Sequence, residues 1–191
     1  GTEEHSWYQD QQTKGAQDWA SKNATSLLGG GASFAEPGAA GIFGGKLAQG
    51  ADLKALQEAK LMAAGGKLPT QVMQDTGWFR GPADNQWRFE IPDNKAALKY
   101  MPSTEGAVAH GSVGSLISHP ELFKNYPQLQ NNKMTLTRQS GDPNGLFEGY
   151  KGDEPLHVVA PNMQQGRSVG LHELQHGVQG IEGFSHGNNA A

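Results

Sequence analysis

The run His172-Glu173-Leu174-Gln175-His176 constrains this chain more than any other feature. It lies in a stretch whose apolar spacing predicts a helix over residues 166–180. Residues four apart share one face of a helix, so both imidazoles can bind one ion at about 2.0 to 2.1 Å per nitrogen. A glutamate directly after the first ligand reaches a water molecule in the open position of the ion and can act as a general base. The motif therefore predicts that His172 and His176 hold Zn2+ and that Glu173 is the catalytic residue of a hydrolase.

Two histidines do not complete a catalytic zinc site, which usually has three protein ligands and a water. Glu182 lies six residues after His176, the offset of the third ligand in H-E-x-x-H-x-x-G-x-x-H proteins, and Gly180 can break the helix so that the chain turns back. That pattern has Gly where Gln179 stands and His or Asp where Glu182 stands. Glu182 is the first candidate for the third ligand and His186 the second, while a plain carboxylate at the helix end is the other interpretation of Glu182.

A short strand over residues 156–160 precedes this helix, with a turn at Pro161-Asn162 and Ser168 as the expected helix cap. Zinc peptidases with this motif often bind an extended substrate along a neighbouring strand by backbone pairing. The sequence therefore predicts a substrate rim at the strand next to the helix. The predicted rim residues are His157, Val158, Val159 and Ala160.

The rest of the chain predicts an α+β fold of zincin-like type, with short antiparallel strands packed on helices that include the active-site helix. Glycines break any pattern in residues 1–45, which we predict to be a flexible linker or arm, and residues 46–191 to be the metallopeptidase domain, cut short at its C-terminus. Asp52 should cap one helix and Thr70 the next. The other expected elements are a helix over 53–63, a short helix over 70–76, a hairpin with strands 78–80 and 87–91, a helix over 120–126 and a strand over 134–137.

Composition excludes several classes of site. The net charge is -4, from 15 basic and 19 acidic residues without a dominant block, so direct nucleic-acid binding is not expected. The absence of cysteine excludes thiolate ligands and leaves His, Asp and Glu to hold a transition metal. No run of apolar residues is long enough for a transmembrane segment, so we expect a soluble chain.

Four phrases, taken in order, resemble one known family. They are Asp75-Thr76-Gly77-Trp78-Phe79-Arg80-Gly81, Trp87-Arg88-Phe89-Glu90-Ile91, His119-Pro120-Glu121-Leu122-Phe123-Lys124-Asn125-Tyr126-Pro127, and Leu171-His172-Glu173-Leu174-Gln175-His176 followed by Gln179 and Glu182-Gly183-Phe184. Over residues 41–189 the chain resembles the zincin-like metallopeptidase domain of bacteriophage and prophage polyvalent proteins, large virion-associated chains carried or injected with the phage genome.

The resemblance implies zinc on His172 and His176, catalysis by Glu173, and a phage virion as the location, with delivery into the bacterial host. In that family a later helix usually carries a Gly-Glu-x-Glu-Ala-Arg-like phrase, whose glutamate is a natural third ligand. No phrase in this chain matches it. The site is then completed beyond the end of the chain, by Glu182, by another chain, or not at all.

The main hypothesis is a zinc-dependent peptidase domain of a phage virion or ejected protein, with a peptide or protein as substrate and other virion proteins as partners. The alternative is a catalytically silent structural or ejection component that retains the zincin core, which the glycine-rich arm and the missing ligand phrase favour. A peptidoglycan hydrolase is a third option, but Trp78, Phe79, Trp87 and Phe89 have the spacing of a buried hairpin face rather than of a glycan-binding cluster.

Overall fold

The hairpin predicted from the aromatic residues is present. The computed structural model describes residues 42–147 and 155–185, so the predicted arm up to residue 41 and the candidate ligand His186 lie outside the described residues. Strands β2 (Trp78–Arg80) and β3 (Trp87–Ile91) pair antiparallel. Their connection closes with hydrogen bonds from Gly81 N to Gln86 O and from Asn85 N to Gly81 O, and Asn85 takes a φ of 60°, which asparagine tolerates better than most residues.

A third strand, β1 (Ile42–Gly44), pairs antiparallel with the other edge of β3, so the sheet order is β1-β3-β2. Ile42 and Phe43 are 3% and 2% exposed. The prediction that the linker extends to residue 45 is therefore wrong for residues 42–45. Local glycine content suggested a linker there, but long-range pairing determines the structure of this segment.

Two helices pack against this small sheet, α2 (Leu53–Ala64) and α3 (Pro69–Thr76). Asp52 caps α2 as predicted, accepting a hydrogen bond from Ala55 N at 2.9 Å. The predicted cap Thr70 is wrong, because α3 begins one residue earlier with Pro69 at its first position and no side-chain cap. A separate apolar cluster of Leu56, Ala59, Val72 and Trp78 joins these elements.

The larger half of the molecule is a four-stranded sheet of order β5-β7-β9-β8. Its strands are β5 (Val108–Ser112), β7 (Lys133–Arg138), β8 (Asn144–Phe147) and β9 (Leu156–Ala160). The α+β class is confirmed, but the expectation of antiparallel strands fails at one pair, since β7 and β9 are parallel. Short helices lie between β5 and β7: α4 (Val113–Leu116), α5 (Pro120–Asn125) and α6 (Pro127–Gln130).

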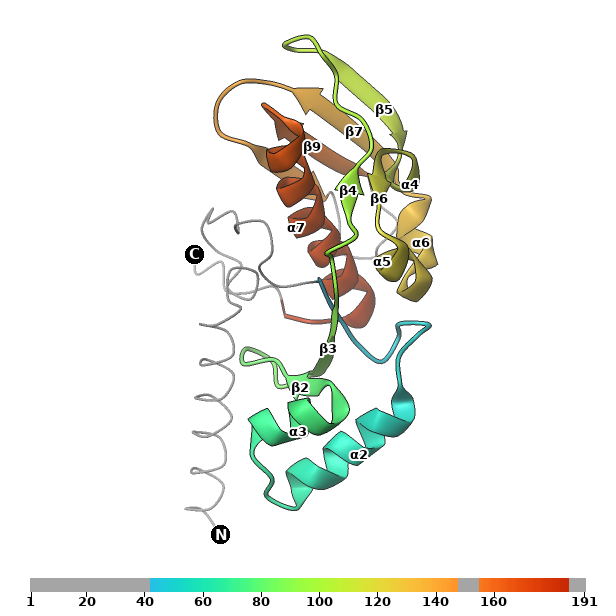
Figure 1. The fold of residues 1–191 in the computed structure, drawn as a ribbon, viewed down its shortest axis with the longest axis vertical. Helices are drawn as coiled ribbons and strands as arrows, with labels where there is room; N and C mark the ends of the chain where they lie inside the picture. The colour runs from blue at the N-terminus through green and yellow to red at the C-terminus, as the bar shows by residue number, and fades with distance from the viewer. Residues whose placement is uncertain (1–41, 148–154, 186–191) are drawn as a thin grey trace.

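The last helix, α7 (Met163–Glu182), lies across one face of this sheet (Figure 1). It begins earlier than predicted, because Asn162 rather than Ser168 is the cap and accepts a hydrogen bond from Gln165 N at 2.9 Å. Leu174 and Val178 of α7 are fully buried in the main core with Leu156 and Val158 of β9. The helix is thus fixed along its length by the sheet.

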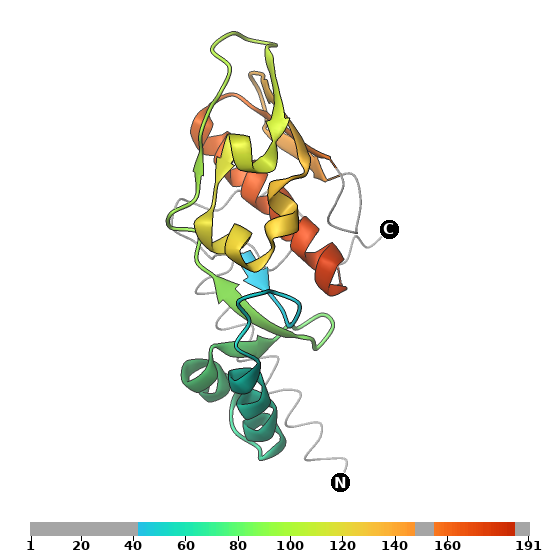
Figure 2. The same ribbon diagram turned by 90° about the vertical axis from the view of Figure 1, so that its right-hand side faces the viewer.

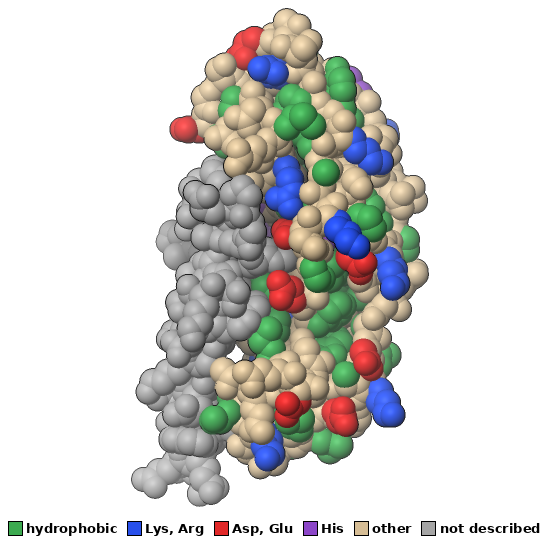
Figure 3. Space-filling model, in the orientation of Figure 1, with side chains coloured by type: hydrophobic (Ala, Val, Ile, Leu, Met, Phe, Trp, Pro, Cys, Tyr) green, Lys and Arg blue, Asp and Glu red, His purple; other side chains and the backbone are tan. Residues whose placement is uncertain are grey.

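The two halves are joined at several points. Strand β4 (Ala97–Leu98), which follows the small sheet in the chain, pairs with β6 (Ile117–Ser118), which lies between β5 and β7 of the larger half. Arg167 of α7 donates hydrogen bonds of 2.8 Å to the carbonyls of Asp93 and Ala96. Figure 2 shows α2 and α3 at one end and the larger sheet at the other, and Figure 3 shows charged side chains of both signs interspersed on one face.

Candidate metal centre

Glycines allow α7 to pack closely against its neighbours. A Cβ atom at Gly166 would lie 3.0 Å from a Leu98 methyl carbon, and one at Gly177 would lie 3.0 Å from both Leu129 and Phe147. A glycine inside a helix costs about 1 kcal/mol relative to alanine, so these positions trade helix stability for close packing. The helix therefore places its exposed side chains at fixed positions relative to the sheet.

The two histidines of the motif face one another on α7. His176 Nε2 lies 3.1 Å from His172 Nε2, with the ring planes at 90° and the ring centroids 4.7 Å apart. Two nitrogens on one tetrahedral zinc ion, each at 2.0 to 2.1 Å, would be about 3.3 Å apart. The observed separation is close to that value, so the pair fits a shared ion with little movement.

The surroundings of His172 favour its neutral imidazole, the form that binds metal. Partial removal from water, with the neighbouring His176 as a second cause, lowers the pKa of His172. His176 Nδ1 lies 2.8 Å from the side-chain oxygen Oε1 of Gln179. Because an amide oxygen only accepts, this hydrogen bond requires the hydrogen on Nδ1, and the neutral ring of His176 then has its lone pair on Nε2, on the side of His172.

Glu173 lies on the protein side of the pair and is 7% exposed. Burial raises the pKa of its carboxyl, and the His176 charge and the backbone N–H of Phe147 in β8 oppose this shift. A Cβ at Gly145 of β8 would lie 2.7 Å from Glu173 Cγ and 3.0 Å from its Oε1. Gly145 thus allows the edge strand to lie directly against the carboxylate.

Glu182 is not close to the histidine pair. Its carboxylate accepts hydrogen bonds from Leu47 N at 2.9 and 3.2 Å and from the Tyr126 hydroxyl at 2.7 Å. The predicted helix break at Gly180 is wrong, since α7 continues to Glu182 and ends at Gly183, whose φ is 70°. Six helical residues turn the side chain about 240° from that of His176. Within residues 42–147 and 155–185, no three His, Asp or Glu side chains are grouped to hold an ion.

The predicted substrate rim needs a correction. Strand β9, with His157, Val158, Val159 and Ala160, is an inner strand whose two edges already pair with β7 and β8. Its backbone therefore has no free edge for a peptide. His157 instead lies within 2.7 Å of the Thr135 hydroxyl through Nδ1. Among the described strands, β8 is an edge strand of the four-stranded sheet, and its residue Gly145 lies against Glu173 of α7.

Sequence reasoning missed a second polar face of α7, which binds the backbone of residues 43–47. Gln175 Oε1 accepts from Phe43 N at 2.6 Å, and Gln175 Nε2 donates to Phe43 O at 3.2 Å. The Tyr126 hydroxyl accepts from Gly45 N at 2.8 Å, and Glu182 binds Leu47 N. A glutamine on the buried face of a helix was the available signal, because buried polar groups almost always have partners.

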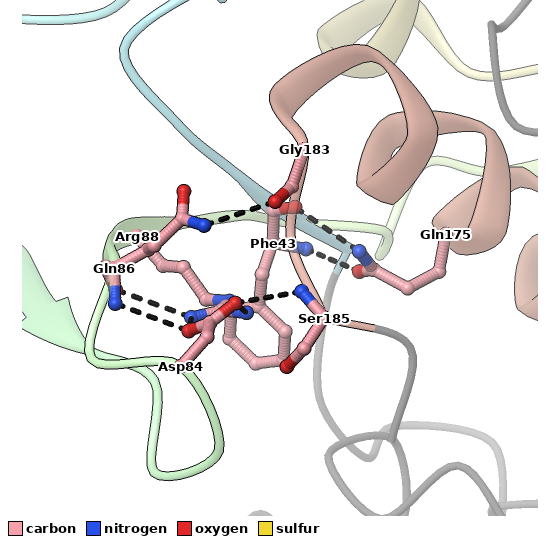
Figure 4. A network of polar contacts seen from close by, with 7 residues as sticks. All are labelled: Phe43, Asp84, Gln86, Arg88, Gln175, Gly183 and Ser185. Atoms are coloured by element: carbon pink, nitrogen blue, oxygen red, sulfur yellow. Dashed lines mark hydrogen bonds and ion pairs between the residues drawn. The ribbon is translucent and has the colours of Figure 1, made fainter. Parts of the chain in front are cut away.

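The turn after α7 is also held by the hairpin loop between β2 and β3 (Figure 4). Asp84 accepts from Ser185 N at 2.7 Å and forms a two-pronged ion pair with Arg88. Burial acts to raise the pKa of Asp84, but Arg88 and the backbone N–H groups of Ser185 and Gln86 outweigh it and hold that pKa below its ordinary value. Gln86 Nε2 donates to Gly183 O at 2.9 Å.

Comparison with known proteins identifies one family model, described as large polyvalent protein associated domain 23, which matches residues 41–99. This segment runs from β1 to β4 and does not include the histidine pair of α7. No curated protein and no solved structure matches the chain. The match supports an association with polyvalent proteins, a phage-related class. In the part of the chain that the structure describes, no helix is long and apolar enough to cross a membrane.

Proposed function

We propose that this chain is a zinc-dependent peptidase domain of a phage polyvalent protein. The observation that carries the proposal is the convergence of His172 and His176 through their Nε2 atoms at 3.1 Å, with the buried carboxylate of Glu173 on the same turn. His172 and His176 would hold the ion. A bound Zn2+ would polarise the peptide carbonyl and make a water molecule more acidic.

Glu173 would take the proton from the attacking water and pass it to the nitrogen of the leaving amine. Burial supports this role, because it raises the carboxyl pKa toward the range in which a group both accepts and returns a proton. The backbone N–H of Phe147 keeps the carboxylate beside β8. Proton transfer therefore takes place at the edge of the sheet.

The substrate would be an extended peptide paired with the outer edge of β8. Its Leu146 side chain is 55% exposed, whereas Gly145 faces Glu173 and leaves room for the carboxylate. A peptide added as a strand gains backbone hydrogen bonds whatever its sequence, and contacts to alternate side chains set its preference. This placement replaces the rim on β9.

Glu173→Gln tests the mechanism. The variant should retain zinc and lose cleavage of a denatured fluorogenic casein probe, because the amide cannot accept the proton. His172→Ala should lose zinc, and His110→Ala, which changes an exposed histidine on β5, should keep both zinc and cleavage. Cleavage by Glu173→Gln at the wild-type rate would reject the catalytic role of Glu173.

A catalytically silent virion component is the second candidate. The observation that favours it is the lack of a third grouped ligand in the described ranges 42–147 and 155–185. A site with two ligands would bind zinc weakly, because three protein ligands are usual for catalytic zinc. Less than about 0.1 equivalent of zinc in the purified chain would select this candidate over the peptidase.

A further inference from the structure

We infer that Gln179 is a positioning residue for His176. Its side-chain amide oxygen accepts the Nδ1 hydrogen of His176 and so fixes both the tautomer and the direction of the ring. This inference rests on the proposed zinc site, but the tautomer itself can be measured without zinc.

The geometry places Gln179 where it can act on the ring. It follows His176 by three residues on α7, one turn further along the same side of the helix. The 2.8 Å contact joins Gln179 Oε1 to Nδ1, while Nε2 of the same ring lies 3.1 Å from His172 Nε2. One ring nitrogen is therefore held by the amide, and the other is turned toward the position that both histidines share.

The tautomer has a chemical consequence. A neutral imidazole has one N–H and one lone pair, and the partner of one nitrogen determines which of them the other presents. With Nδ1–H bound to Gln179, Nε2 of His176 is the ligand atom. Partners of this kind usually change metal affinity about 10- to 100-fold.

The backbone of Gln179 is also fixed. Its carbonyl accepts hydrogen bonds from Gly183 N and, at 3.0 Å, from Phe184 N. The guanidinium carbon of Arg88 lies 4.0 Å from the centre of the Phe184 ring. Gln86, in the loop of the same hairpin, donates a hydrogen bond to Gly183 O (Figure 4). The segment that matches the polyvalent-protein family thus supports the helix end from which Gln179 reaches His176.

Two substitutions separate positioning from simple packing. Gln179→Met has a similar length but no acceptor, so His176 should lose its preference for the Nδ1–H tautomer and zinc should bind about 10- to 100-fold more weakly. Gln179→Glu restores the acceptor with a negative charge and should return the tautomer and bind zinc at least as tightly as the wild type. Gln164→Met, an exposed change in the first turn of α7, is the matched control and should alter neither property.

The tautomer is read from the ring nitrogen shifts of His176 in long-range nitrogen–proton spectra of the full zinc-free chain. Zinc affinity is measured by competition with a chromophoric chelator. An unchanged tautomer and unchanged affinity in Gln179→Met would overturn the inference. If the wild type shows the fixed tautomer but does not bind zinc, the proposed function fails while the positioning of the ring by Gln179 stands.

Discussion

Replacement of Glu182 by alanine tests whether this residue is a structural anchor or a zinc ligand. The carboxylate is 7% exposed and accepts hydrogen bonds from the Leu47 N–H and the fully buried Tyr126 hydroxyl. Glu182→Ala leaves both donors without this acceptor. A buried donor that loses its partner costs about 1 to 3 kcal/mol, and this cost applies to the Tyr126 hydroxyl, because Leu47 is 56% exposed and its N–H can bind water instead. The free energy of unfolding should therefore fall by about 1 to 3 kcal/mol.

Urea unfolding followed by fluorescence and circular dichroism measures this loss. Glu182→Gln is the matched control, because it keeps the shape and one carbonyl oxygen and should lose about half as much stability. A double-mutant cycle with Tyr126→Phe should show a coupling of about 1 to 3 kcal/mol, since the two side chains share one hydrogen bond.

Zinc content decides the interpretation. The folded fraction of Glu182→Ala should bind as much zinc as the wild type. In the wild type the Glu182 carboxylate binds Tyr126 and Leu47 and does not point toward the histidines, so its loss should leave the zinc ligands unchanged. A variant that unfolds within about 0.5 kcal/mol of the wild type and has lost its zinc would refute this reasoning. It would return Glu182 to the ligand set.

Three further predictions follow from single positions. Burial, and then the Arg167 charge, lower the pKa of His119 from 6.5 to about 4. The His119 imidazole therefore binds a proton more tightly in the unfolded chain than in the folded one. Stability should therefore fall by about 3 kcal/mol between pH 6.5 and pH 4, and His119→Asn should show a smaller loss in urea unfolding at the two pH values. Gly145→Val should displace Glu173 and reduce cleavage while zinc remains bound; full activity would contradict the close packing. Gln175→Leu should speed hydrogen exchange at the Phe43 amide, and unchanged protection would show that β1 is held by other contacts.

The features predicted correctly have local causes. The turn between β2 and β3 consists of turn-forming residues, and α7 combines an apolar stripe with a capping residue before it, although Asn162 serves rather than Ser168. Asp52 caps α2 through a bond to a residue three positions on. Such contacts span a few residues, so they leave a pattern in the sequence.

The features that were missed depend on distant partners. Strand β1 is bound by Gln175, which is 132 residues away, and its own glycines suggested a linker. Strand β8 is only four residues long and pairs with β9. This pairing occupies the edge of β9 that was predicted to bind the substrate. Glu182 was placed by counting residues, but the uninterrupted helix turned it away from His176.

The way in which residues 43–47 are held has a consequence for how this segment can vary. Gln175, Tyr126 and Glu182 bind the main-chain N–H groups of alternate residues, at positions 43, 45 and 47. The exposed side chains of Lys46 and Leu47 take no part in these bonds, so they can change freely without loss of attachment. Proline at any of the three bound positions would remove a donor, and at Gly45 even alanine would collide with Phe184 and Glu182. Diverged relatives should therefore keep Gly45 and this attachment while positions 46 and 47 vary.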